Sequence, residues 1–357
     1  MKKYIYLLTV AALATSCTTK LPRIVFTGKA QGLTDAVFIV TDAEGKNVVG
    51  QNITDGNIKV DTVFEGPAGY GTLGINKNGE KKKEFEVYLE AAQYTVEADA
   101  AHLSSYPKIT STSGIQNELT AYYSIQEEVE RKAQDKVVVL GQGQAEIADN
   151  NNKLDAFKQF VAKTPNSLAA PHIMMNLKYE QNLEAYYELF QKLSPAAKQT
   201  EEGKFLETKF SGMMKLLPGK DAPLIIGTTP DGKKFDKAAL DKKVYIVDFW
   251  KAGNQVSRLN HQDMIGGAIK NLNMAKVGII SVSLDNKREW WTKAIEGDKM
   301  NWPQYSDLKG DESANAVAWA ITRIPTYYIL NGKWQVVARD VSYSKLEYTV
   351  NQYLEGK

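Results

Sequence analysis

Cysteine is almost absent from this sequence. Its 357 residues contain one cysteine, Cys17. One cysteine cannot form an internal disulfide, and disulfide exchange needs an attacking thiolate and a second thiol that resolves the mixed disulfide. A chain of this length can bury stable cores without disulfides. The scarcity of cysteine therefore argues against both a disulfide scaffold and self-contained dithiol chemistry.

An excess of charge of one sign is also lacking. The sequence has 44 basic and 42 acidic residues, and loss of Lys2 and Lys3 with a cleaved leader would leave 44 − 2 = 42 basic residues. A nearly neutral chain is a poor ligand for phosphate backbones, so we expect no nucleic-acid partner. The densest basic run, Lys81–Lys83, is flanked by Glu80 and Glu84 and is typical of a solvated hairpin end.

Histidine is scarce too. His102, His172 and His261 are the three histidines, and they show no metal-ligand spacing. Ser257 and His261 stand four residues apart on one predicted helix face. A hydrolase would also need an orienting acid and an oxyanion hole, and no Gly-x-Ser-x-Gly elbow is present. We therefore expect no metal, no cofactor and no Ser–His hydrolase, with His261 packed or at the surface.

The first seventeen residues have the pattern of an export signal. Lys2 and Lys3 precede the short apolar stretch Tyr4–Ala14, and small residues lead to Cys17. Ala14–Cys17 resembles a bacterial lipobox, although such boxes usually carry leucine where Ala14 stands. The resemblance predicts a signal peptide over residues 1–17, lipidation of Cys17 and a membrane anchor facing the periplasm. The alternative is a plain signal peptide with an incidental cysteine.

Residues 21–110 have the pattern of an antiparallel β-module. Short alternating segments are separated by turn residues, which predicts a sandwich or barrel. The expected strands are Arg23–Ala30, Ala36–Thr41, Asn57–Phe64, Gly71–Asn76 and Lys83–Leu89. Through Phe26–Gly28, Phe85–Leu89 and Tyr94–Val96 the segment resembles the β-module of unknown function that precedes thioredoxin domains in many Bacteroidetes lipoproteins.

Residues 113–217 are expected to be helical. Gly114–Lys132 and Leu154–Val161 carry apolar residues three and four positions apart. Ser167 is a candidate cap for the helix that follows. An aromatic face from Leu183 to Leu193 predicts core or inter-domain packing, with a peptide-binding groove as the alternative.

Residues 218–357 show a strand and helix order of their own. The nearly continuous apolar run Val244–Trp250 predicts a buried central strand, broken only by Asp248. The helix Gln255–Asn273 and a second buried strand, Lys276–Leu284, follow. Further along, Asn331-Gly332 predicts a hairpin turn between Thr326–Leu330 and Trp334–Arg339. Helices Arg288–Glu296, Ser313–Ala320 and Lys345–Leu354 complete the order β-α-β-α-β-β-α.

Several phrases in this last segment resemble thioredoxin-fold proteins of the TlpA-like branch and its AhpC/TSA relatives. They are Gly219–Pro223, Val247–Trp250, Val282–Asp285, Trp302-Pro303 and Ile324–Thr326. The resemblance implies an α/β thioredoxin-like domain in which Pro325 is cis. It also places the expected Cys-x-x-Cys motif on Asn254, Gln255, Val256 and Ser257.

That motif has lost its chemistry. Asn254 carries no nucleophile, and the Ser257 hydroxyl cannot form a disulfide. Asn254 is among the best N-cap residues, so we expect it to cap the helix that begins here. Asp248 matches the buried acid of thioredoxins and is expected to be a buried, hydrogen-bonded carboxylate. Asp285 is expected to cap the helix Asn286–Glu296.

We therefore expect no catalytic residue and a redox-inactive envelope lipoprotein that binds a peptide or protein, or assists its assembly. The groove retained from the family would be formed by Trp250, Gly253, Arg323, Ile324, Pro325 and Thr326. Its partner is an unidentified envelope polypeptide. One alternative is an enzyme, a thiol-disulfide oxidoreductase or peroxiredoxin-like reductase, as the family suggests. The other is a structural lipoprotein that binds through its β-module.

Overall fold

The computed structural model describes residues 21–77, 84–134, 142–267, 269 and 271–356. The predicted signal peptide with Cys17, and the predicted solvated hairpin end at Lys81–Lys83, lie outside these residues. The chain divides into two compact units, with the boundary between Leu177 and Lys178. This boundary lies inside the predicted helical segment 113–217.

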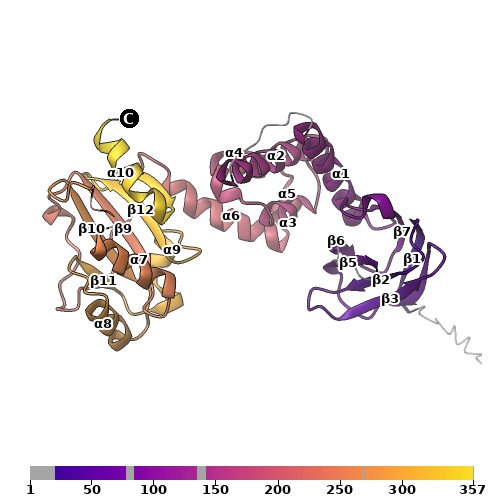
Figure 1. The fold of residues 1–357 in the computed structure, drawn as a ribbon, viewed down its shortest axis with the longest axis horizontal. Coiled ribbons are helices and arrows are strands. Elements are labelled where there is room, and N and C mark those ends of the chain that lie inside the picture. The colour runs from indigo at the N-terminus through magenta and orange to yellow at the C-terminus, as the bar shows by residue number, and fades with distance from the viewer. Residues whose placement is uncertain (1–20, 78–83, 135–141, 268, 270, 357) are drawn as a thin grey trace, which may run out of the picture. The chain divides into compact units, whose positions relative to one another are not determined.

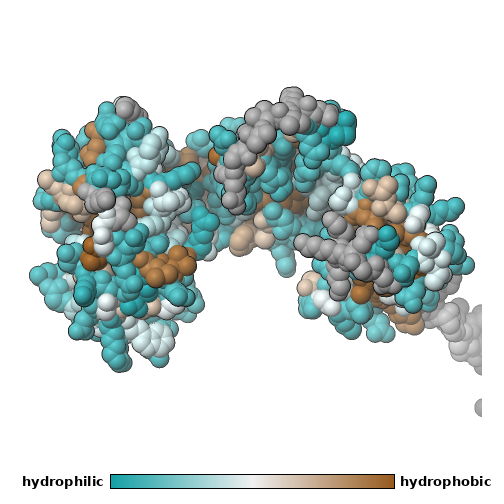
Figure 2. Space-filling view, viewed as in Figure 1, coloured by the Kyte–Doolittle hydropathy of each residue, from teal (hydrophilic) through white to brown (hydrophobic). Residues whose placement is uncertain are grey.

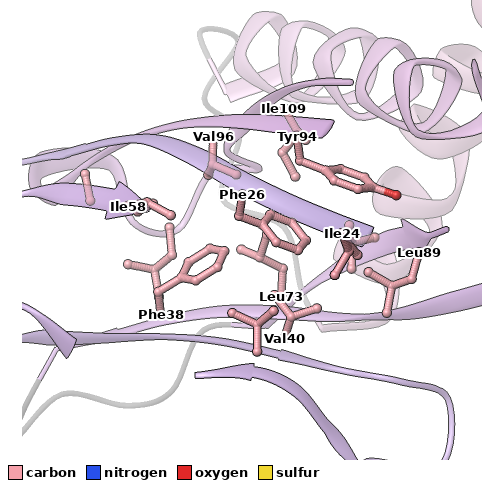
Figure 3. Close-up of a cluster of buried hydrophobic side chains, with 14 of the residues drawn as sticks. Ile24, Phe26, Phe38, Val40, Ile58, Leu73, Leu89, Tyr94, Val96 and Ile109 are labelled. Atoms are coloured by element: carbon pink, nitrogen blue, oxygen red, sulfur yellow. The ribbon is translucent and has the colours of Figure 1, made fainter. Parts of the chain in front are cut away.

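The first unit begins with a β-sandwich (Figure 1). Its two four-stranded sheets have the strand orders β4-β1-β7-β8 and β3-β2-β5-β6. Side chains from both sheets meet in one apolar core, in which Phe26, Phe38 and Tyr94 form aromatic contacts (Figure 3). The strands are β1 (Arg23–Gln31), β2 (Ala36–Thr41), β3 (Asn47–Ile53), β4 (Asn57–Val63), β5 (Gly69–Lys77), β6 (Glu84–Leu89), β7 (Gln93–Asp99) and β8 (Lys108–Ser111). The predicted sandwich is confirmed.

One feature of the sandwich corrects the prediction of an antiparallel module. Strands β1 and β7 pair in parallel, with Gly28 opposite Val96. Gly28 has φ +146°, and a Cβ atom there would lie 1.9 Å from the carbonyl oxygen of Val96. Glycine is therefore required where these two strands meet. Strands β3, β7 and β8 were not among the expected ones; β3 contains Gly50 and buries only Val49 and Ile53, which weakens its alternation.

The described part of the first unit also contains the short helix η1 (Ala100–His102) and the helices α1 (Gly114–Gln134), α2 (Gln142–Lys163) and α3 (Ala170–Met175). Both predicted helices are confirmed, and α2 begins twelve residues before the predicted Leu154. Ser167 Oγ accepts the backbone N–H of Ala170 at 3.1 Å and donates to Glu118 at 2.8 Å. Ser167 thus serves the start of α3, although the N-cap position itself is Ala169.

The second unit begins with helices that pack around Phe210. The rings of Tyr179, Tyr187 and Phe190 contact the Phe210 ring at centroid distances of 5.4–5.6 Å. The predicted aromatic face is therefore core packing. The elements are η2 (Tyr179–Asn182), α4 (Leu183–Lys192), α5 (Pro195–Lys198), α6 (Glu201–Met213) and η3 (Met214–Leu216).

The rest of the second unit is a five-stranded sheet with helices around it (Figure 1). The strand order is β11-β10-β9-β12-β13; β9, β10 and β11 are parallel, and β12 and β13 are antiparallel to their neighbours. The strands are β9 (Val244–Trp250), β10 (Val277–Ser283), β11 (Gln304–Ser306), β12 (Thr326–Asn331) and β13 (Val336–Val341). The helices are η4 (Lys237–Ala239), α7 (Gln255–Gly266), α8 (Arg288–Gly297), η5 (Gly310–Glu312), α9 (Ala314–Ala318), η6 (Tyr343–Lys345) and α10 (Leu346–Leu354).

The predicted strands and helices occur in the predicted order, with β11 as an additional strand that was not expected, and α7 is shorter than expected. It ends at Gly266, because Gly267 adopts the left-handed conformation and its N–H bonds to the carbonyl of Met264. Among the described residues, no helix is both long and apolar enough to cross a lipid bilayer. On the face drawn in Figure 2, hydrophilic residues cover most of the surface, and apolar residues form separate patches.

The central strand β9 is buried on both faces. Tyr245, Val247 and Phe249 pack in one core, which contains Trp319 and Trp334. Val244 and Ile246 pack in another, with Met264 of α7 and Leu346 of α10. Side chains of a strand alternate between its faces, so Asp248 points to the same side as Val244 and Ile246. A carboxylate is thereby placed inside the unit, beneath α7.

Candidate functional site

Helix α7 begins where the Cys-x-x-Cys motif is expected, and Asn254 caps it. Asn254 has extended backbone angles, and its Oδ1 accepts the N–H of Ser257 at 2.8 Å. Its carbonyl accepts the N–H of Arg258 at 3.1 Å. The predicted cap is confirmed. The side chain at the attacking position is therefore hydrogen-bonded to the start of the helix.

Ser257, at the second cysteine position, is sealed inside the protein. It is fully buried, and within the described part of the chain its Oγ has no hydrogen-bond partner. The Nδ1 atom of His261 also has none among those residues. Ser257 and His261 are therefore not joined by a hydrogen bond, and no substrate reaches the hydroxyl. The structure does not assemble a Ser–His hydrolase.

Beneath Ser257, two buried ionisable side chains face each other. Nε2 of His261 lies 2.7 Å from Oδ2 of Asp248, and both side chains are fully buried. An ionised Asp248 only accepts hydrogen bonds, so His261 donates from Nε2. Ser281 donates to the same carboxylate oxygen at 2.9 Å. The expectation of a buried, hydrogen-bonded Asp248 is confirmed, and His261 is the partner that sequence reasoning missed.

A second buried carboxylate lies on the other side of the imidazole. Oδ2 of Asp298 is 3.7 Å from Nδ1 of His261. Arg258 donates to both oxygens of Asp298, and Gln262 donates at 3.0 Å. Burial alone would raise the pKa of Asp298, but the hydrogen bonds from Arg258 and Gln262 and the nearby positive charge hold that pKa below its ordinary value. Residues of one helix face are thus tied to the end of α8.

The loop before β12 contains the predicted cis bond, between Ile324 and Pro325. Thr326 is buried, and its hydroxyl donates to the carbonyl of Arg323 at 2.6 Å. The Arg323 guanidinium forms hydrogen bonds of 2.8 and 2.9 Å to both oxygens of Asp340. Neither the N–H nor the carbonyl of Ile324 has a hydrogen-bond partner among the described residues.

One side chain of the predicted groove does not lie at a surface. Trp250 is fully buried and packs with Trp291, Ala294 and Met300. Its side chain therefore cannot contact a ligand, and the prediction that it lines the groove is wrong. The Thr326 side chain is 5% exposed, so it supports the loop from inside instead.

A pocket of about 410 Å³ does lie at the start of α7. It brings together Gly253 and Asn254 from one predicted segment and Ile324 from the other. Gly253 is exposed, and an added Cβ atom would meet no other atom within 4 Å. The pocket wall also includes Lys251, Leu284, Asp285, Asn286, Trp290, Gly310 and Asp311.

Asp285 corrects another prediction. The N-cap position of α8 is Lys287, which makes no side-chain cap hydrogen bond. Oδ2 of Asp285 instead accepts the N–H of Ala252 at 2.9 Å and the hydroxyl of Ser283 at 2.7 Å. Asp285 therefore fixes the loop that enters α7. A sequence pattern of helix caps could not reveal this, because Ala252 lies 33 positions away.

The sheet order, the helix after β9 and the cis-proline before β12 define a thioredoxin-like domain. The whole chain contains one cysteine, Cys17, outside that domain. No protein-family model and no curated protein matches the chain.

Solved structures from Bacteroides are similar to parts of it. The C-terminal domain of a putative thiol-disulfide oxidoreductase from Bacteroides thetaiotaomicron is 23% identical, with 40% of this chain and 99% of that chain covered and a TM-score of 0.37. The thioredoxin domain of a thiol-disulfide oxidoreductase from Bacteroides vulgatus is 28% identical, with 39% and 98% covered and a TM-score of 0.35. A thioredoxin-like protein from Bacteroides caccae is 17% identical, with 66% and 77% covered and a TM-score of 0.42.

Proposed function

We propose that this chain is a redox-inactive, lipid-anchored protein of the cell envelope that binds an extended polypeptide segment through its thioredoxin-like domain. One observation carries the proposal. Where the fold normally presents a reactive thiol, the Asn254 amide is bonded to the helix end, and the Ser257 hydroxyl beneath it is fully buried. Neither side chain can attack or resolve a disulfide.

The surroundings of Asn254 support binding. The pocket there is open, since Gly253 leaves its entrance free of a side chain. The backbone of Ile324 at the same pocket offers a donor and an acceptor that no described residue uses. An extended peptide can pair with such groups as an added strand, which gives affinity without covalent chemistry.

The location of the protein is part of the same proposal. Ala14–Cys17 has the lipobox pattern, and acyl chains on Cys17 would hold the protein at a membrane, because each buried methylene contributes about 0.8 kcal/mol. Thr18, Thr19 and Lys20 follow Cys17 and do not resemble the acidic surface-export signal of Bacteroidetes lipoproteins, which favours an anchor that faces the periplasm. The partner is then an envelope polypeptide, without nucleic acid and without a cofactor.

Reduction of insulin by dithiothreitol tests the lack of redox chemistry. We expect the purified full chain to leave the rate of insulin precipitation equal to that with dithiothreitol alone. The variant Cys17→Ser removes the single thiol and should behave identically. A rate above background that disappears in Cys17→Ser would overturn the proposal, because it would show turnover through the N-terminal cysteine.

Peptide titration followed by NMR tests the binding. We expect an extended, uncharged peptide to shift the backbone amide signals of Gly253, Asn254 and Ile324. Gly253→Trp should block the pocket, while Gly266→Trp places the same side chain at another exposed glycine with no atom within 4 Å of an added Cβ. No shift with any peptide, or equal shifts in both variants, would contradict binding at this pocket.

A further inference from the structure

The wall of the pocket carries a charge that the described residues leave without a cationic partner. Asp285 is 5% exposed and lines the pocket. Both of its side-chain hydrogen bonds come from neutral donors, Ala252 and Ser283, and both reach Oδ2. Oδ1 accepts no hydrogen bond from the described residues. Burying a carboxylate without a cation has an unfavourable free energy, so a positively charged ligand group at this oxygen would be bound favourably.

The neighbouring cations are bound elsewhere. Lys251 pairs with the exposed Asp311 at 2.5 Å. Arg258 lies near enough to Asp285 for that carboxylate to contribute to the raised pKa of the guanidinium, but its hydrogen bonds go to Asp298 and to the carbonyl of Ala252. Among the described residues, no lysine or arginine forms an ion pair with Asp285.

Apolar surface adjoins this carboxylate. Leu284, Trp290 and Ile324 line the same pocket, and the indole of Trp290 is 51% exposed. The Nζ atom of Lys287 already lies over the Trp290 ring, 4.2 Å from its centroid. An apolar wall beside a carboxylate suits a side chain with an alkyl stem and a cationic end. A volume of about 410 Å³ is large enough for a ligand of this kind.

We infer that the pocket receives a lysine or arginine side chain of the bound polypeptide, with its stem against Trp290 and Ile324 and its cation at Asp285. This inference rests on the proposed function, because the peptide backbone is what Ile324 holds. It adds a specificity that the proposed function does not contain. The exposed pair Lys251–Asp311 at the pocket does not oppose entry, since such pairs contribute only about 0–1 kcal/mol.

The experiment compares three blocked peptides that differ at one central position, which is lysine, norleucine or glutamate. Binding to the full chain is measured by calorimetry. We expect the lysine peptide to bind about tenfold more tightly than the norleucine peptide, because a hydrogen bond to a charged group adds this much. The glutamate peptide should bind more weakly than either. Butylamine, which has the cation and stem without a peptide backbone, should bind much more weakly than the lysine peptide.

Asp285→Asn is the decisive variant. An asparagine Oδ1 can still accept from Ala252 and Ser283, so the loop keeps its hydrogen bonds while the charge is lost. The preference for lysine should then fall to about twofold or less, within the scatter of a neutral hydrogen bond. The matched control Asp311→Asn removes an exposed carboxylate from the same pocket and should keep most of the preference.

The outcomes separate the two ideas. Equal binding of the lysine and norleucine peptides to the unmodified chain overturns the cation pocket and leaves peptide binding intact. A lysine preference that persists in Asp285→Asn overturns the assignment to Asp285. Butylamine binding as tightly as the lysine peptide shows a small-amine site instead. Binding of none of the peptides overturns the proposed function together with this inference.

Discussion

The buried pair beneath α7 gives the sharpest test of how this domain is held together. We consider the substitution His261→Leu, which removes the donor to Asp248 and keeps a side chain of comparable size. Asp248 is fully buried, and after the change Ser281 would be its remaining donor in the described part of the chain. Leucine cannot supply the missing hydrogen bond.

The size of the effect follows from burial. Removing the donor to a buried carboxyl group leaves an acceptor unsatisfied and costs about 1–3 kcal/mol, and more where that acceptor is charged. His261→Leu should therefore lower the free energy of unfolding of the second unit by about this amount. Asp248→Asn, added to His261→Leu, should restore about half or more of the loss, because it removes the charge while Ser281 can still bond to the amide. The second substitution stabilises only in the presence of the first.

Tryptophan fluorescence during urea denaturation is the suitable assay. All six tryptophans lie between Trp250 and Trp334, so their emission reports the second unit without a contribution from the first. Leu259→Ala on the same helix is the control; this side chain is 55% exposed, and the expected change is within about 0.5 kcal/mol. A loss below about 1 kcal/mol for His261→Leu, or additive effects of the two substitutions, would refute the idea that Asp248 depends on His261.

Three other predictions concern separate elements. Asn254→Ala should lower the stability of the second unit by about 1 kcal/mol, and Asn254→Asp should lower it by much less, as checked by urea denaturation. Because the pKa of Asp298 is lowered in the folded protein, its carboxylate stabilises the fold at pH values above its ordinary pKa of 3.8. This stabilisation is lost as the pH falls through the folded-state pKa, so Asp298→Asn should make the free energy of unfolding fall less steeply at acid pH. Gly28→Ala should lower the stability of the first unit by about 3 kcal/mol or more, because Gly28 has a positive φ and an added Cβ would clash with the Val96 carbonyl. Gly50→Ala should be tolerated, because no atom lies within 4 Å of an added Cβ there. The thermal transition of the first unit, followed by circular dichroism, distinguishes the two variants.

Patterns along the chain predicted much of the fold. The sandwich, α1, β9, β10 and the hairpin after Pro325 each follow from local alternation, helical spacing or turn residues. These features are local, because the spacing of apolar residues within a strand or helix is enough to predict it. Features without such a local pattern were missed: β3 buries only Val49 and Ile53 and shows no clear alternation, and the parallel pairing of β1 with β7 joins residues about 68 positions apart.

Some features of the candidate site could likewise be predicted from the sequence, and others could not. The loss of both thiols, the cap at Asn254 and the cis-proline at position 325 could be predicted from the residues and their resemblance to a family. The hydrogen-bond partner of Asp248 could not be predicted. Hydrophobic spacing can indicate whether His261 faces the core or the solvent, but it does not indicate which side chain His261 contacts. The same limit hid the role of Asp285, whose position before a helix resembled that of a cap.

The sequence by itself determined which side chains are available: its 357 residues contain one cysteine, and the expected Cys-x-x-Cys positions carry Asn254 and Ser257. Tertiary structure decided where the remaining polar groups act. Trp250 is enclosed against Trp291, Asp248 is bonded to His261, and Asp285 is left facing a pocket, because each depends on chain segments that only folding brings together. Side-chain identity gives the chemistry available, and long-range packing decides which groups are covered, paired or open to a ligand.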